Sequence, residues 1–300
     1  MISVNLVGNK LSDEGIAVLA TVLSDDQLLD LNIAHNGIAD TAAIVSILRG
    51  ARNLRELCLG GNTIGDDGVI EIANALGYHP NIRKIDLSYN NITDKGTEAL
   101  SELFRQNMSI RSIDLAGNSI GDVGATTLSR GMRENRVLEE LGLARNEISD
   151  VGAEALAKLL GMQSLPLMHL WLAGNQISAK GILSFGHELR CNSTLRSLDV
   201  RFNQIAQEEE VSPMLDVVTG CNTTISHCKL FGYPDDTKRP QVLCNYHTKL
   251  NKAGKGFARS RPELLSHVLA RQAANPETID TLYGLLLESP HSWLYSRNDD

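Results

Sequence analysis

The sequence predicts an α/β solenoid in which short parallel strands form one layer and helices form the other. Three observations predict this fold. An apolar motif that ends in Asn recurs eight times, a turn segment rich in Asp, Ser and Gly follows most copies, and an apolar pattern of helical spacing closes each unit. The chain has 300 residues, of which 42% are hydrophobic, as in an ordinary globular protein with a continuous core.

The recurring motif has the form LxxLxLxxN, where L stands for an aliphatic residue. Its alternating apolar positions predict a short strand with one buried face. The closing asparagines follow one another at intervals of 26 to 29 residues. They are Asn9, Asn36, Asn62, Asn90, Asn118, Asn146, Asn175 and Asn203. A ninth, degenerate copy at residues 225–232 keeps the apolar positions and lacks the Asn.

Each motif Asn lies where the chain turns out of its strand. A side-chain amide both donates and accepts hydrogen bonds. We therefore expect these asparagines to form a structural ladder that satisfies buried backbone groups of neighbouring turns.

The segment after each Asn predicts a helix. It carries Ser, Thr or Asp and then Gly, as in Ile148-Ser-Asp-Val-Gly152, and these polar residues are typical helix N-caps. Apolar residues then recur at intervals of three and four, as in residues 152–160, which indicates an amphipathic helix. Because no single unit buries its own apolar face, stability must come from stacking neighbours.

The motif and its spacing resemble the leucine-rich repeat family, and the 28-residue period resembles the ribonuclease-inhibitor-like subclass of that family. The resemblance covers residues 1–232, as eight repeats plus the degenerate ninth. It implies a horseshoe with parallel strands on the concave face and helices on the convex face. It implies little about function, because proteins with this fold have many different functions.

Both ends of the predicted solenoid depart from the repeat. The C-terminal region, residues 233–300, holds five of the eight prolines and two amphipathic patterns, and we expect it to form a helical cap, with a partner-binding helical tail as the alternative. Residues 1–228 carry a net charge of −10, whereas residues 229–271 carry +6. We expect the N-terminal edge to be uncapped, and it is then either a tolerated exposed edge or one covered by a missing N-terminal segment, a partner or a second copy. The apolar residues expected to face solvent at that edge are Val4, Leu6, Ile16, Leu19 and Leu23.

Composition argues against several classes of partner. The net charge of −8 disfavours binding to nucleic acid or to an anionic membrane, since both need clustered Lys and Arg. No apolar stretch has the length of a membrane span, and the first residues lack the pattern of a secretory signal. Five scattered cysteines without a CxxC pair predict neither a disulfide framework nor a zinc site. We therefore expect a cytoplasmic protein.

No catalytic constellation is visible. The eight histidines are scattered, no HExxH motif is present, and the carboxylates recur at fixed repeat positions, as expected for turn residues. We expect no enzymatic activity, no cofactor and no metal.

The outward-facing strand positions predict a surface for a protein partner. Motif positions 3, 5 and 7 point away from the core, and position 8 lies beside them. The early repeats place an acidic stripe there, formed by Asp30, Glu56, Asp86, Asp114 and Glu140, for which a solvated face is the simpler explanation. The late repeats gather aromatic and charged residues of the types that dominate interfaces, unless the C-terminal tail covers Trp171 instead. The expected partner contacts are Trp171, Arg145, Arg201, Phe202, Asp199, His169, Tyr89, Asp86 and Asp114.

Three functions fit such a surface. The first is an interaction scaffold that binds a protein on the concave face. The second follows from a resemblance to the GTPase-activating Ran regulators, which share the repeat subclass and would use Arg145 or Arg201, although the long acidic tail of that family is missing. The third follows from a resemblance to tropomodulin-like actin regulators, although no separate actin-binding helix precedes the repeats.

Overall fold

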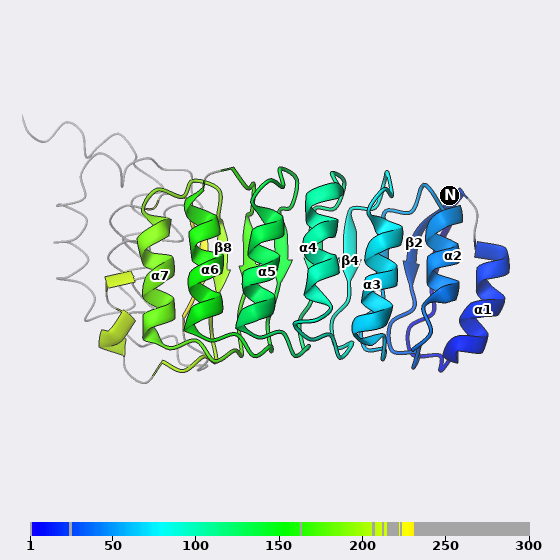
Figure 1. The fold of residues 1–300 in the computed structure, drawn as a ribbon, viewed down its shortest axis with the longest axis horizontal. Coiled ribbons are helices and arrows are strands. Elements are labelled where there is room, and N and C mark those ends of the chain that lie inside the picture. Colours follow the sequence, from blue (N-terminus) through cyan, green and yellow to red (C-terminus); the bar gives the residue numbers. More distant parts are fainter. Residues whose placement is uncertain are drawn as a thin grey trace, which may run out of the picture.

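The computed structural model describes residues 2–23, 26–162, 164–205, 208–211, 213–214, 222 and 224–230. Within these ranges the chain alternates between strand and helix, so the predicted α/β solenoid is confirmed (Figure 1). The expected C-terminal cap at 233–300 lies outside the described residues, as do the last two positions of the ninth repeat.

The described strands form one sheet whose order follows the chain, and every neighbouring pair is parallel. The strands are β1 (Ile2–Asn5), β2 (Leu28–Asn32), β3 (Glu56–Cys58), β4 (Lys84–Asp86), β5 (Ser112–Asp114), β6 (Glu140–Gly142), β7 (His169–Trp171), β8 (Ser197–Asp199) and β9 (His227–Lys229).

The helices form a second layer in which each helix packs beside the next (Figure 1). They are α1 (Ser12–Leu23), α2 (Ala42–Gly50), α3 (Gly65–Leu76), α4 (Thr97–Gln106), α5 (Asp122–Met132), α6 (Asp150–Gly161) and α7 (Ala179–Leu189), followed by the short 3₁₀ helix η1 (Glu208–Val211).

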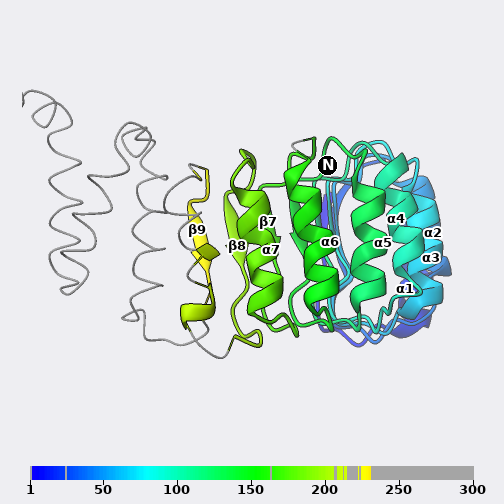
Figure 2. The ribbon, with the colours of Figure 1, turned by 60° about the vertical axis from the view of Figure 1, so that its left-hand side comes forward.

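The helix layer needs more space per repeat than the strand layer, and this difference bends the solenoid. Packed helices need about 8–10 Å between axes, whereas hydrogen-bonded strands need only about 4.8 Å. The sheet must therefore lie on the inside of the curve. Figure 2 shows the consequence, because α5 to α7 stand apart in that view while α1 to α4 crowd together at its right-hand side.

The core lies between the two layers and is continuous from repeat to repeat. In the third repeat, the strand residues Leu57 and Leu59 and the helix residues Val69, Ile72 and Leu76 are fully buried. Truncation of one such Leu or Ile to Ala costs about 2–5 kcal/mol, so this apolar spine is the main source of stability.

The side-chain amides of the motif asparagines bridge consecutive turns. Asn118 Oδ1 accepts hydrogen bonds from the backbone N–H groups of Asn90 and Ile92, at 2.9 and 3.0 Å. Its Nδ2 donates to the carbonyl oxygens of Leu87 and Leu115, at 3.1 and 2.9 Å. Equivalent bonds between turns are made by Asn36, Asn62, Asn90, Asn146, Asn175 and Asn203.

The aspartates that follow the motif act across repeats, which differs from the local N-caps expected from the sequence. Asp122 begins α5, yet its Oδ1 accepts from the N–H groups of Ser149 and Gly152, both at 2.8 Å, at the start of α6. Ser149 Oγ donates to Asp122 Oδ2 at 2.6 Å. One carboxylate therefore satisfies the first turn of the following helix. The same role belongs to Asp13, Asp66, Asp94 and Asp150.

A second polar ladder lies at the other end of the repeats, before the strands. Asn107 donates from Nδ2 to the Leu76 carbonyl at 2.7 Å and accepts at Oδ1 from the Ile110 N–H at 2.9 Å. One repeat earlier, His79 makes the same pair of contacts with Ala51 and Ile82. The corresponding residues of later repeats are Asn135, Asn192 and Asn222. Asn107, Asn192 and Asn222 are buried, as expected for side chains that bond to backbone groups of neighbouring repeats.

The N-terminal edge is less exposed than the sequence predicts. Ile16 is fully buried, because α2 packs against α1, so the expectation that it faces solvent is wrong. The other four residues of that edge are partly buried against the core: Val4, Leu6, Leu19 and Leu23. Asn9 is exposed, and its amide bonds within its own turn to the Val7 carbonyl at 3.4 Å.

Candidate protein-binding surface

Strand register lines up equivalent residues in rows across the concave face. Motif position 5 pairs Asp86 with Asp114, Asp114 with Gly142, and Gly142 with Trp171. The row continues from Trp171 to Asp199 and Lys229. The acidic stripe and the late aromatic residues therefore belong to one surface, and they adjoin where Glu140 pairs with His169.

The acidic residues of position 5 have a local structural role that sequence reasoning missed. Asp86 Oδ1 accepts from the Ser88 N–H, and Asp114 Oδ1 accepts from the Ala116 N–H, both at 2.9 Å. This is an Asx turn, in which a short polar side chain satisfies the N–H two residues on. The signal in the sequence is the recurrence of Asn or Asp at position 5, as in Asn32. Part of the acidic stripe is therefore explained by the turn.

Trp171 occupies the same position without an oxygen to offer the turn. Its ring stacks on the ring of His169, with 5.8 Å between centroids and 10° between planes. Both side chains are partly buried, and the Trp171 backbone pairs with Gly142 on one side and Asp199 on the other. The stacked rings of His169 and Trp171 form one aromatic pair on the outward face of β7.

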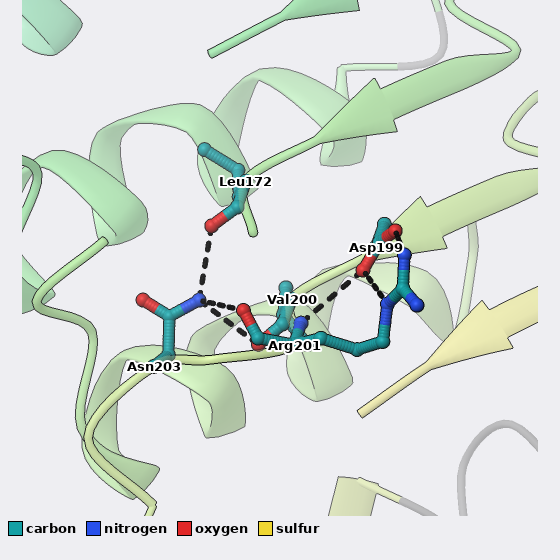
Figure 3. Close-up of polar contacts among 5 residues, drawn as sticks. All are labelled: Leu172, Asp199, Val200, Arg201 and Asn203. Atoms are coloured by element: carbon teal, nitrogen blue, oxygen red, sulfur yellow. Dashed lines mark hydrogen bonds and ion pairs between the residues drawn. The ribbon is translucent and has the colours of Figure 1, made fainter. Parts of the chain in front are cut away.

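Asp199 and Arg201 form an ion pair on the neighbouring strand β8 and the turn after it (Figure 3). Arg201 donates from Nε to Oδ1 at 2.9 Å and from Nη2 to Oδ2 at 2.7 Å. The Asp199 side chain is only 8% exposed, so it positions Arg201 and offers little surface to a partner. The hydrogen bond to Asp199 also raises the pKa of the Arg201 guanidinium.

The remaining predicted contacts lie at position 8, in the turns. Phe202 is 64% exposed, and the Arg201 guanidinium carbon lies 5.8 Å from the centre of its ring. Tyr89 is 47% exposed, and Arg145 is also exposed. The structure thus brings His169, Trp171, Arg201 and Phe202 together on β7, β8 and the turn after β8, with Arg145 one repeat before Trp171. Tyr89, Asp86 and Asp114 belong to the earlier half of the surface.

In the early half of the concave face, negative charge and partial burial both raise pKa values. Burial raises the pKa of the Asp114 carboxyl, and the neighbouring Asp86 raises it further. Burial also raises the pKa of the Cys58 thiol, with Asp86 adding to the effect. This half of the concave face therefore favours a cationic partner group.

The repeat pattern is that of a known family. The family described as leucine-rich repeat matches residues 1–20, 50–73, 78–101, 106–129, 134–157 and 191–208. The chain is built from leucine-rich repeats. The matched segments lie between the first strand and the turn after β8, and the longest stretches between them are residues 21–49 and 158–190.

Two solved structures resemble these leucine-rich repeats. Actin-binding site 2 of leiomodin-1 is 16% identical, with a TM-score of 0.40, over 67% of this chain and 96% of that chain. An internalin from Listeria monocytogenes is 18% identical, with a TM-score of 0.42, over 76% of this chain and 68% of that chain. No curated protein matched the chain.

The described part of the leucine-rich repeat solenoid contains no group of three or more side chains placed to hold a metal ion. Among its described helices, none is both long and apolar enough to cross a membrane. The feature that stands out on its concave face is instead the aromatic and charged cluster on β7 and β8.

Proposed function

We propose that this leucine-rich repeat protein is an interaction scaffold that binds another protein on its concave face, with Trp171 as the anchor. The observation that carries the proposal is the place of Trp171. It lies in a row that holds Asn or Asp in five of the other repeats and Cys58, Gly142 and Lys229 in the rest, so the repeat architecture itself does not call for an aromatic ring there. Trp and Arg residues are typical of the centres of interfaces.

The surroundings of Trp171 support this role. His169 fixes the ring by stacking, and Asp199 fixes Arg201, so these side chains lose little conformational freedom on binding. Phe202 adds exposed apolar area at the adjacent turn. We place the protein in the cytoplasm and assign it no catalysis, cofactor or metal.

The Ran-regulator-like alternative gains no support from the geometry of Arg201. An arginine that enters a partner's active site must be able to leave its own contacts, and Arg201 is held by two hydrogen bonds to Asp199. Arg145 is the candidate that remains for such a role. The tropomodulin-like alternative is tested by the effect of the protein on actin filament elongation.

Capture of partners by the immobilised protein tests the proposal. The test variant combines Trp171→Ala with Phe202→Gly, since neither side chain holds a buried polar group. The control variant is Tyr78→Ala, which removes an aromatic ring that is 83% exposed in the connection between α3 and β4. We expect one or more proteins to bind the wild type and the control, and to be lost with the test variant. Identical captured proteins for all three would refute the concave anchor.

A further inference from the structure

A row of large side chains occupies left-handed backbone positions in alternate repeats. We call it the turn row. Its members are His35, Tyr89, Arg145 and Phe202, with φ of 57°, 52°, 54° and 57°. The intervening repeats place glycine at the equivalent position, at Gly61, Gly117 and Gly174, with φ of 71°, 68° and 72°. Position 8 of the motif therefore alternates strictly between a large residue and Gly.

The alternation has a steric cause. The Tyr89 ring lies across Gly117 so closely that a Cβ on Gly117 would overlap it. The His35 ring covers Gly61 in the same way, and a Cβ on Gly174 would lie 3.3 Å from Arg145 Cγ. His35 and Tyr89 therefore cover the turn of the next repeat as well as their own, and those next repeats accommodate only Gly without a shift of the ring.

The fold itself does not require these side chains. A left-handed backbone is unfavourable for a non-glycine residue, and Gly meets the same turn without that cost in the alternate repeats. Tyr, Arg and Phe are uncommon in this conformation. Backbone outliers of this kind cluster at functional sites. The four side chains also share one property, since imidazole, phenol, guanidinium and phenyl groups all present a planar π face.

The spacing of the turn row matches one kind of partner. Adjacent strands are about 4.8 Å apart, so alternate repeats are separated by about 9.6 Å. A polyproline II helix advances about 3.1 Å per residue with three residues per turn, so every third residue recurs at about 9.3 Å. A segment in this conformation that crosses the repeats would place one face of its helix on each successive planar side chain.

The charge beside the row indicates the rest of the chemistry. The Asx turns hold the Asp86 carboxylate in the turn that leads to Tyr89, and the Asp114 carboxylate in the turn that leads to Gly117, where the Tyr89 ring lies. Asp30 and Glu56 extend the negative charge toward His35, and Lys84 is the opposing charge on the same strand row. Arg145 is positive, so cationic partner groups belong over β2 to β5.

We propose that the turn row binds an extended, proline-rich segment of a partner protein in the polyproline II conformation, with Lys or Arg side chains directed at the carboxylates of β2 to β5. Prolines stack on the planar side chains, as they do in other aromatic-lined grooves that bind this helix. The inference rests on the proposed function, because it names the class of segment that the concave face binds.

Direct titration with synthetic peptides tests this proposal. The probes are four repeats of Pro-Pro-Arg, four repeats of Gly-Ser-Arg with the same charge and length, and four repeats of Pro-Pro-Glu. Twelve residues of polyproline II span about 37 Å, which exceeds the distance of about 29 Å from β2 to β8. Fluorescence anisotropy should show Pro-Pro-Arg binding at least tenfold more tightly than either of the others. Equal affinity for the two arginine peptides, or no binding of either, would overturn the proposal.

A matched pair of variants locates the site. Tyr89→Gly should weaken Pro-Pro-Arg binding by about tenfold while the protein stays folded, since Gly already serves this turn in neighbouring repeats. Tyr78→Ala should leave the affinity unchanged. An unchanged affinity in Tyr89→Gly would overturn the assignment of the row. If the peptides fail while a captured protein still depends on Trp171, the scaffold function stands and this inference falls.

Discussion

The Asp199 carboxylate holds the Arg201 guanidinium through two hydrogen bonds and also accepts the Arg201 backbone N–H at 3.2 Å. One nearly buried side chain therefore sets both the turn after β8 and the direction of the arginine (Figure 3). The exposed surface of this region is consequently Trp171, Arg201 and Phe202, with Asp199 as their support.

Because Asp199 and Arg201 bond to each other, we expect their contributions to the free energy of unfolding to be coupled. Arg201→Ala leaves a largely buried carboxylate without its charged partner, which should lower the free energy of unfolding by about 1–3 kcal/mol. Asp199→Asn keeps an acceptor for the backbone N–H and removes the charge. In the double variant the loss should therefore be smaller than the sum of the two single losses, as measured by urea unfolding. Additive losses would show that the pair contributes no coupling.

The asparagine ladder predicts a difference between its interior and its first position. Asn118→Ala removes the partner of four backbone groups, so we expect a loss of at least about 3 kcal/mol in the free energy of unfolding. Asn9→Ala removes one long bond at an exposed site and should leave the unfolding midpoint unchanged. Similar losses in the two variants would contradict the bridging role.

Two adjacent aspartates at the start of α3 have different roles. Asp66 makes hydrogen bonds to the next repeat, whereas Asp67 makes only an ion pair at the surface. Asp66 accepts from the Thr93 and Gly96 N–H groups, at 2.8 and 3.0 Å, so Asp66→Ala should cost about 1–2 kcal/mol. Asp67 makes an exposed ion pair with Lys95, and this pair lowers the pKa of Asp67. Because such pairs contribute little, Asp67→Ala should unfold at the wild-type denaturant concentration. The reverse order of effects would contradict the interpretation.

His79 predicts a pH dependence of stability. It is 4% exposed, and burial lowers the pKa of its imidazole below the ordinary value of about 6.5. As the pH falls below about 6.5, the unfolded chain takes up this proton before the folded chain does, so stability decreases until the pH passes below the folded-state pKa. Above pH 6.5 the imidazole is neutral in both states and has no effect.

The control for this titration is the residue that other repeats use. His79→Asn should keep a donor for the Ala51 carbonyl and an acceptor for the Ile82 N–H, as Asn107 does for its own turn. The difference in unfolding free energy between the variant and the wild type, measured from pH 8 to pH 5, should then shift in favour of Asn as the pH falls. A difference that is constant with pH would show that His79 does not titrate on unfolding.

The sequence predicted those features that depend on the repeat itself. Strand, Asn and helix recur at nearly constant spacing, so the fold and the alignment of position 5 across strands follow from the period. Ile16 was predicted wrongly, because a single end repeat still packs against its neighbour. The Asp66 and Asp122 bonds were missed because their partners lie about 27 to 30 residues away and are not visible to local N-cap rules.

The candidate site was only partly predictable for the same reason. The outward direction of Trp171 and Phe202 follows from the strand period. The stacking of His169 on Trp171 and the hydrogen bonds from Arg201 to Asp199 depend instead on side-chain conformations. The alternation of Tyr89 with Gly117 is present in the sequence. Its meaning required the backbone angles and the position of the ring.

Photo-crosslinking from defined positions tests the central claim most directly. A photoreactive phenylalanine at Ser197, which pairs with His169 across the concave face, is compared with one at Val123, which is exposed on α5. In the cells that express the protein, we predict a crosslinked partner from position 197 that disappears when Trp171→Ala is added, and no such partner from position 123. A partner that crosslinks only from position 123, or equally with and without Trp171, would contradict the concave face as the binding surface.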